Sequence, residues 1–214
     1  MRNKIAKGLA MAALSLFLLH PAFAQNAPKI SGGSQIRLFD AWAQFPYPSW
    51  HKTENALKES RLSRHQQADT FVLAMVPKSE TFQKWTKQYT LVGHWNENLT
   101  LSKFISSSIH TFSKPCGVEN VSVRKIIRQP DSGLVVVFCT NSPNGPKQYG
   151  YGEGVGEVVI LWMGKHKNTF VKIYQYWRGN KFNVADASTW PVTTQRLDRS
   201  VLEFTGIKLL PYTP

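Results

Sequence analysis

Four apolar runs in the second half of the chain constrain its fold more than any other feature of the sequence. Each run has a strand-type hydrophobic pattern, and turn-forming residues separate them, such as Pro130-Asp131-Ser132-Gly133 after the first run. Such a series predicts an antiparallel meander. The last run carries apolar side chains on both faces, which is typical of a strand in the middle of a sheet. The runs are Val121 to Arg128, Leu134 to Thr140, Val158 to Met163 and Thr169 to Trp177.

Two amphipathic helices are expected to accompany this sheet. The first begins at the N-cap candidate Thr100 and is stopped by Pro115, with its apolar side chains on one stripe. The second begins at Thr193 or Thr194 and stops at Gly206. The sequence therefore predicts an α+β fold: a single two-layer domain in which an antiparallel β-sheet has two principal helices packed on one face.

The first half of the chain has weaker patterns. Thr70 to Val76 reads as a core strand, and the spacing of the aromatic residues in 79–89 predicts a short helix or helical turn. Thr53 to Ser63 fits either a short helix or one arm of a hairpin. Ile36 to Trp42 is expected to be a first ordered segment. In Phe45 to Trp50 aromatic residues alternate with prolines, which predicts an extended segment on the domain surface.

The N-terminus has the pattern of a secretory signal peptide. Three basic residues in the first eight positions precede an uninterrupted apolar run, Leu9 to Leu19, and Ala22-Phe23-Ala24 is a small-x-small cleavage site. Eleven residues span only about 16 Å as a helix, against roughly 30 Å of membrane hydrocarbon. We therefore expect cleavage near Ala24 and a periplasmic or secreted protein, of bacterial or, less favoured, eukaryotic origin.

The expected organisation is a signal peptide at 1–24, an extended leader with the aromatic-proline segment at 25–50, and one α+β domain at 51–214. The formal charge of +13 falls to +10 when the three basic residues of the signal are removed. This balance favours anionic partners at an envelope surface or an acidic protein. Nucleic acid is not expected as a partner because the chain is exported, and no later segment is apolar enough to cross a membrane.

Cys116 and Cys139 are the two cysteines of the chain. In an oxidising compartment they are expected to form a disulfide, which would remove about 3.5 kcal/mol of denatured-state entropy by closing the loop between them. A catalytic thiol is the alternative, without the support of a C-x-x-C spacing. The histidines show no pair spaced for zinc, so we expect neither a metal nor a cofactor.

The segment Asn144 to Glu157 contains five glycines, two tyrosines and two carboxylates. It does not have the context of a phosphate-binding loop, since a strand and not a helix follows it. We interpret Tyr149, Tyr151, Glu153 and Glu157 as a partner-contact loop, with a plain linker as the alternative. No sequence motif of a hydrolase nucleophile is present, so no catalytic residue is predicted.

An early strand ending in proline (FVLAMVP, 71–77), one long helix, a run of antiparallel strands and a C-terminal helix follow one another in this chain. This layout resembles the PsbP-like fold, which periplasmic DcrB-like lipoproteins share. The resemblance covers roughly residues 60–210 and rests on element order. The chain departs from DcrB-like proteins because it has no lipoprotein cysteine. The resemblance implies an accessory role and not catalysis.

Two hypotheses about function follow. The first is a non-catalytic periplasmic binding protein, an accessory factor of a cell-envelope or secretion complex. The alternative is a small secreted hydrolase of an anionic envelope polymer, with Glu153, Glu157 and a histidine such as His94 as acid-base candidates, or a secreted effector.

Overall fold

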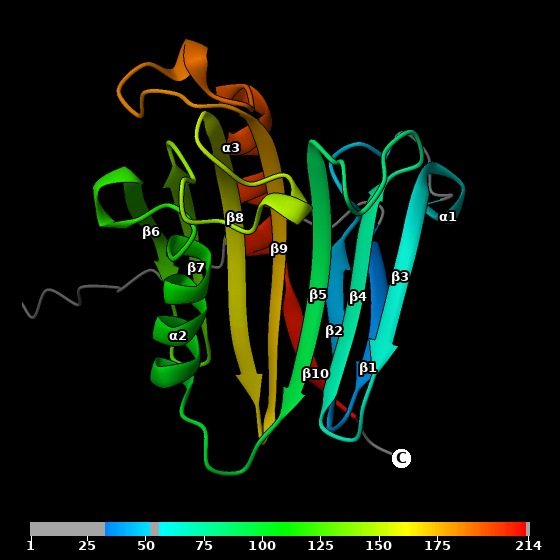
Figure 1. Ribbon diagram of the computed structural model, residues 1–214. Helices are drawn as coiled ribbons and strands as arrows, with labels where there is room; N and C mark the ends of the chain where they lie inside the picture. The colour runs from blue at the N-terminus through cyan, green and yellow to red at the C-terminus, as the bar shows by residue number, and fades with distance from the viewer. Residues whose placement is uncertain (1–32, 52–55, 213–214) are drawn as a thin grey trace, which may run out of the picture.

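The computed structural model describes residues 33–51 and 56–212, and within them the chain is built mainly from β-strands in two sheets (Figure 1). The predicted signal peptide at 1–24 lies outside the described residues. So does the start of the predicted leader, up to residue 32.

The large sheet has seven antiparallel strands in the order β3-β4-β5-β9-β8-β7-β6. The meander predicted from the four apolar runs is confirmed as β6 to β9, and β9 lies at the centre of the sheet as expected. The strands are β3 (Ser60–Gln66), β4 (Thr70–Pro77), β5 (Lys87–Trp95), β6 (Val121–Arg128), β7 (Ser132–Cys139), β8 (Val155–His166) and β9 (Thr169–Asn180).

The small sheet joins the two ends of the described chain. β2 (Ala41–Pro46) lies between β1 (Gly33–Leu38) and β10 (Lys208–Pro211), and both pairings are antiparallel. Residues of the predicted leader therefore belong to the core, where Ala41, Ala43 and Phe45 are buried. The aromatic-proline segment begins inside β2, because Phe45 and Pro46 end that strand.

The prediction that both principal helices lie on one face of the sheet is wrong. α2 (Leu101–Ser113) lies in front of the large sheet in Figure 1, whereas α3 (Thr194–Thr205) and the small sheet lie behind it. The fold is β-rich with a helix on each face, and not a two-layer α+β domain. The helix boundaries themselves are confirmed: Thr100 and Thr193 are the N-caps, and Gly206 ends α3.

The physical reason lies in the central strands, which are covered on both sides. All eight residues of β7 are buried. Val135 and Val137 join the front core, the apolar cluster under α2, with Phe104 and Phe112. The alternate residues of β7 join the back core, the cluster that contains α3 and the small sheet. A near-continuous apolar run is typical of a strand buried on both faces, and the sequence carried that signal.

The predicted helix at 79–89 is also wrong: turns and bends lead into β5, which begins at Lys87. Trp85 and Tyr89 are both buried, as core residues of this loop and strand and not as a helix stripe. For residues 53–63, where helix and hairpin arm were both open, the described part forms a single turn, α1 (Ala56–Glu59), followed by β3.

Candidate ligand pocket beside α2

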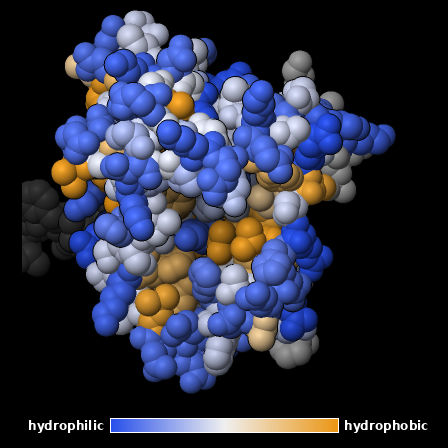
Figure 2. Space-filling model, viewed as in Figure 1, coloured by the Kyte–Doolittle hydropathy of each residue, from blue (hydrophilic) through white to orange (hydrophobic). Residues whose placement is uncertain are grey.

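The front face of the large sheet is only half covered. α2 contacts β7 and β8, and no helix lies over β4 and β5 in the described part of the chain (Figure 1). Figure 2 shows hydrophobic side chains in view on this face, beside the polar surface of the helix. At the boundary between the covered and uncovered halves lies a pocket of about 230 Å³, hereafter the α2 pocket. Its lining comprises Asp69, His94, Trp95, Asn96, Leu99, Phe104, Ser107, Ser108, Thr111 and Lys172.

Three elements bring these side chains together. β9 contributes Lys172, β5 contributes His94, and α2 contributes the hydroxyl residues. In the sheet register Lys172 is opposite Val92 and His94 is opposite Phe170, so Lys172 and His94 are diagonal neighbours on one face. Phe104 of α2 contacts the rings of both His94 and Phe170, which holds the helix over this position.

Lys172 is the charged centre of the pocket. Its ammonium group forms no ion pair or hydrogen bond within the described residues, and its nearest aromatic contact is the ring of Phe112, 6.0 Å from Nζ to the centroid. Burial lowers the pKa of Lys172 from its ordinary value. A partly dehydrated cation that lacks a protein counter-charge is a site at which an anion is stabilised.

His94 is oriented by a short polar chain. The hydroxyl of Thr70 donates to Asp69 Oδ1 at 3.2 Å, so the same oxygen is the acceptor for His94 Nδ1 at 3.3 Å. Burial and then the positive charge of Lys172 lower the pKa of His94, and Asp69 opposes this shift. In the free protein the imidazole is therefore held toward its neutral form, with the proton on Nδ1.

The hydroxyls of α2 differ in what they offer. Ser107 donates to the carbonyl of Phe104 at 3.1 Å, and Thr111 donates to the carbonyl of Ser107 at 2.9 Å. Ser108 is only 2% exposed and lines the pocket, and its hydroxyl makes no hydrogen bond within the residues that the structure describes. The α2 pocket thus combines an unpaired ammonium, an unpaired hydroxyl and an imidazole, a set suited to holding an anionic group.

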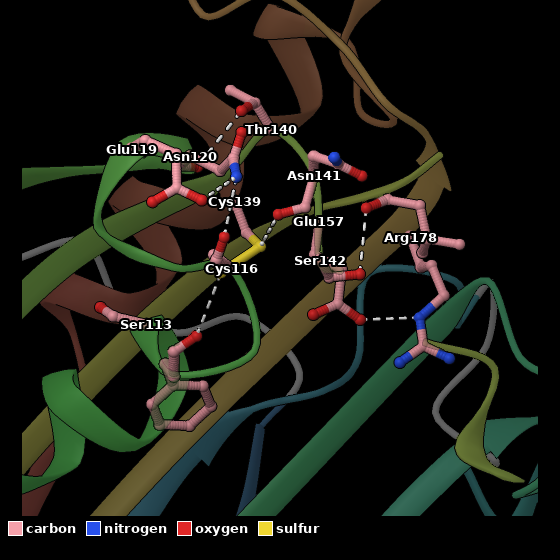
Figure 3. Close-up of a disulfide and its surroundings, with 12 residues drawn as sticks. Ser113, Cys116, Glu119, Asn120, Cys139, Thr140, Asn141, Ser142, Glu157 and Arg178 are labelled. Atoms are coloured by element: carbon pink, nitrogen blue, oxygen red, sulfur yellow. Dashed lines mark hydrogen bonds and ion pairs between the residues drawn. A yellow bond between two sulfur atoms is a disulfide. The ribbon is translucent and has the colours of Figure 1, made fainter. Parts of the chain in front are cut away.

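The glycine-rich segment lies at the other end of the same face, and only part of it is exposed. Glu157 is 3% exposed in β8 and accepts a hydrogen bond from Arg178 Nε at 2.7 Å (Figure 3). Burial raises the pKa of Glu157, and the guanidinium opposes that shift. Arg178 also donates to the carbonyl of Tyr149 at 2.7 Å. Glu157 and Arg178 therefore fasten the loop to the sheet.

The remaining predicted contact residues separate into two kinds. The ring of Tyr151 lies 4.3 Å from the guanidinium of Arg178, which also stacks on Trp85 at 3.5 Å, and burial raises the pKa of Tyr151 to about 12. Tyr149, 52% exposed, and the exposed Glu153, which accepts from Asn141 at 2.9 Å, are the two that a partner can reach.

The predicted disulfide is confirmed. Cys116 follows α2 and is bonded to Cys139 at the end of β7, with 5.5 Å between the Cα atoms (Figure 3). Both cysteines are buried. The bond ties the C-terminal end of α2 to the sheet and so helps to fix the helix that forms one wall of the α2 pocket.

The structure does not bring together the acid-base candidates of the alternative hydrolase hypothesis. In the sheet register Glu157 is opposite Arg178 and His94 is opposite Phe170. These β9 positions are eight residues apart, or about 27 Å along a strand. Glu157 and His94 therefore cannot act on one bond.

The described residues contain no group of three or more potential metal ligands among histidine, cysteine, aspartate and glutamate. Nor does any helix in the described ranges have the length and apolar character needed to cross a membrane.

Comparison with known proteins does not place the chain in a family. No protein-family model matches it, and no curated protein matches its sequence. The candidate site therefore rests on its own geometry.

Sequence reasoning named His94 but missed Lys172 and Ser108. A signal for Lys172 was present, since it is the one charged residue within the apolar run from Phe170 to Trp177. Ser108 sits in the Ser106-Ser107-Ser108 run of α2, where small side chains leave room between helix and sheet. Neither sequence signal shows which strand lies opposite Lys172 or Ser108 in the folded protein.

Proposed function

We propose that the protein is an exported, non-catalytic binding protein, an accessory factor of the cell envelope, and that it holds its ligand or partner in the α2 pocket. The observation that carries the proposal is Lys172, a partly buried cation without a counter-charge in the described structure, at the wall of an open pocket. An accessory role is also what the resemblance to PsbP-like domains implies.

Export is supported by two features. The first 24 residues have the pattern of a cleavable signal, and the cysteines form a bond that persists in oxidising compartments. Tyr149 and Glu153, exposed at the far end of the same face, offer a second contact to a partner protein.

Binding without catalysis is supported by the pocket hydroxyls. Ser107 and Thr111 donate to helix carbonyls, and His94 Nδ1 is bonded to Thr70. An activated nucleophile needs a base within hydrogen-bond reach of its hydroxyl. The imidazole here is hydrogen-bonded through Nδ1 to the threonine instead.

Site-specific photo-crosslinking in the native envelope tests this proposal. A photo-reactive amino acid replaces Trp95, which is 37% exposed at the pocket, and in a matched control it replaces Leu202, which is 62% exposed on α3 behind the sheet. We expect a discrete crosslinked species from position 95 and none from position 202. Equal crosslinking from both positions, or turnover of an envelope polymer by the purified protein, would overturn the proposal.

A further inference from the structure

The α2 pocket presents hydrogen-bond donors from two facing elements. Lys172 Nζ comes from β9 and the hydroxyl of Ser108 from α2, and both are without partners among the described residues. Ser108 lines the pocket, so its hydroxyl is available to a ligand as a hydrogen-bond donor. Two donors without protein partners at one pocket form a site for an acceptor that the protein itself does not supply.

We propose that the α2 pocket binds a tetrahedral oxyanion, a phosphate or sulfate group, with Lys172 supplying the charge, Ser108 a hydrogen bond, and His94 a further hydrogen bond from Nε2 when that nitrogen takes up a proton. This inference rests on the proposed function, since it names the chemistry of the ligand at the same site. Donors from β9 and α2, joined by protonated His94 of β5, line the space, which suits an anion with three or four oxygens.

The volume of the pocket limits the ligand. A volume of about 230 Å³ is many times what a single water needs. This is enough for an oxyanion with its remaining hydration. It is below the roughly 300 Å³ at which pockets enclose drug-sized ligands. The pocket therefore takes the anionic group, and the rest of a larger ligand stays outside.

His94 couples binding to protons. Within the pocket lining the titratable groups are Asp69, His94 and Lys172. The charge of Lys172 depresses the pKa of His94, and a bound anion neutralises that charge, so binding raises the pKa of His94. Linkage then requires tighter anion binding at lower pH. Asp69, exposed at the rim, weakens the attraction without reversing it, because the cation lies deeper.

Calorimetric titration of the mature chain with sodium sulfate tests the inference, since sulfate keeps its charge between about pH 5 and 8. Lys172→Met removes the ammonium and keeps most of the stem, and Lys208→Met, on the exposed end of β10, is the control with the same change in net charge. We expect wild type to bind sulfate more tightly at the lower pH, Lys172→Met to lose about tenfold or more, and Lys208→Met to lose less than about twofold. Ser108→Ala is a milder second variant that keeps the helix, with an expected loss of about fivefold.

Two further arms identify the source of the anion. Binding of inorganic phosphate, and binding of phosphatidylcholine vesicles that contain phosphatidic acid, are each measured with the wild type and with Lys172→Met. Lys172-dependent binding of phosphate alone indicates a free anion, and Lys172-dependent binding of the vesicles indicates a lipid headgroup. Absence of sulfate and phosphate binding, or equal binding by Lys172→Met, would overturn the inference even if position 95 crosslinks to a partner. Sulfate binding without a crosslinked partner would leave the inference standing and remove the accessory role.

Discussion

Cys116 and Cys139 connect the C-terminal end of α2 to the end of β7, so one covalent bond holds the helix that forms a wall of the α2 pocket. The disulfide and the pocket lie along the same helix. We therefore expect stability and the proposed ligand binding to be linked through the position of α2.

Replacing both cysteines by serine is expected to lower the free energy of unfolding by about 3.5 kcal/mol, because the denatured chain regains the entropy of the open loop. Urea unfolding of the oxidised and the substituted protein measures the change. We also expect weaker sulfate binding by the substituted protein while it remains folded. A substituted protein that keeps both the stability and the affinity of wild type would contradict this link.

Arg178→Met is expected to destabilise the protein by about 3 kcal/mol or more, because it leaves Glu157 buried without its counter-charge and releases the carbonyl of Tyr149. Denaturant unfolding provides the measurement. Glu153→Gln, an exposed carboxylate on the same loop, is the control, with an expected change within about 0.5 kcal/mol. Equal effects of the two substitutions would show that the buried ion pair does not fasten the loop.

Lys172→Met is expected to stabilise the free protein, by about 1 kcal/mol, because it removes a partly buried charge that has no partner in the described structure. Thermal unfolding without added anions shows this as a higher Tm than wild type. Gain of stability together with loss of binding is the pattern of a functional residue. A lower Tm would mean that Lys172 serves the fold instead.

The stability of the protein should fall at acid pH partly because of His94. Burial lowers its pKa below the ordinary 6.5, so the unfolded chain takes up the proton first as the pH drops. The contribution of His94 to the free energy of unfolding is fully present above pH 6.5. It is lost as the pH falls through the lower pKa that His94 has in the folded protein. The free energies of unfolding of wild type and His94→Asn are compared as a function of pH, so that the contributions of the other histidines cancel. The wild type should weaken relative to the variant only on the acid side, and a constant difference would refute the shift.

The parts of the fold that could be predicted are those that depend on local chemistry. Thr100 and Pro115 delimit α2, Thr193 and Gly206 delimit α3, and turn residues delimit β6 to β9. Placement of the helices on opposite faces was missed because both are amphipathic and a helix does not encode which side of a sheet it covers. The aromatic spacing before Lys87 fitted a helix, but pairing of β5 with β9 and β4 decided the outcome.

The candidate site could be predicted only in part. His94 drew attention as a histidine, and the disulfide was predicted from the expected export of the chain. The pocket depends on the strand register that makes Lys172 and His94 diagonal neighbours, and on the packing of α2 that brings Ser108 to the same pocket. Both are tertiary relations between segments that are far apart in the chain.

The most direct test of the central claim is to map where sulfate binds, by following backbone amide chemical shifts of the isotope-labelled mature protein during titration. The account predicts saturable shifts gathered at Trp95, Ser107, Ser108 and Lys172, which Lys172→Met abolishes. Weak, non-saturating shifts spread over the exposed lysines and arginines, unchanged in Lys172→Met, would contradict it and would reduce the anion affinity to the general basic charge of the surface.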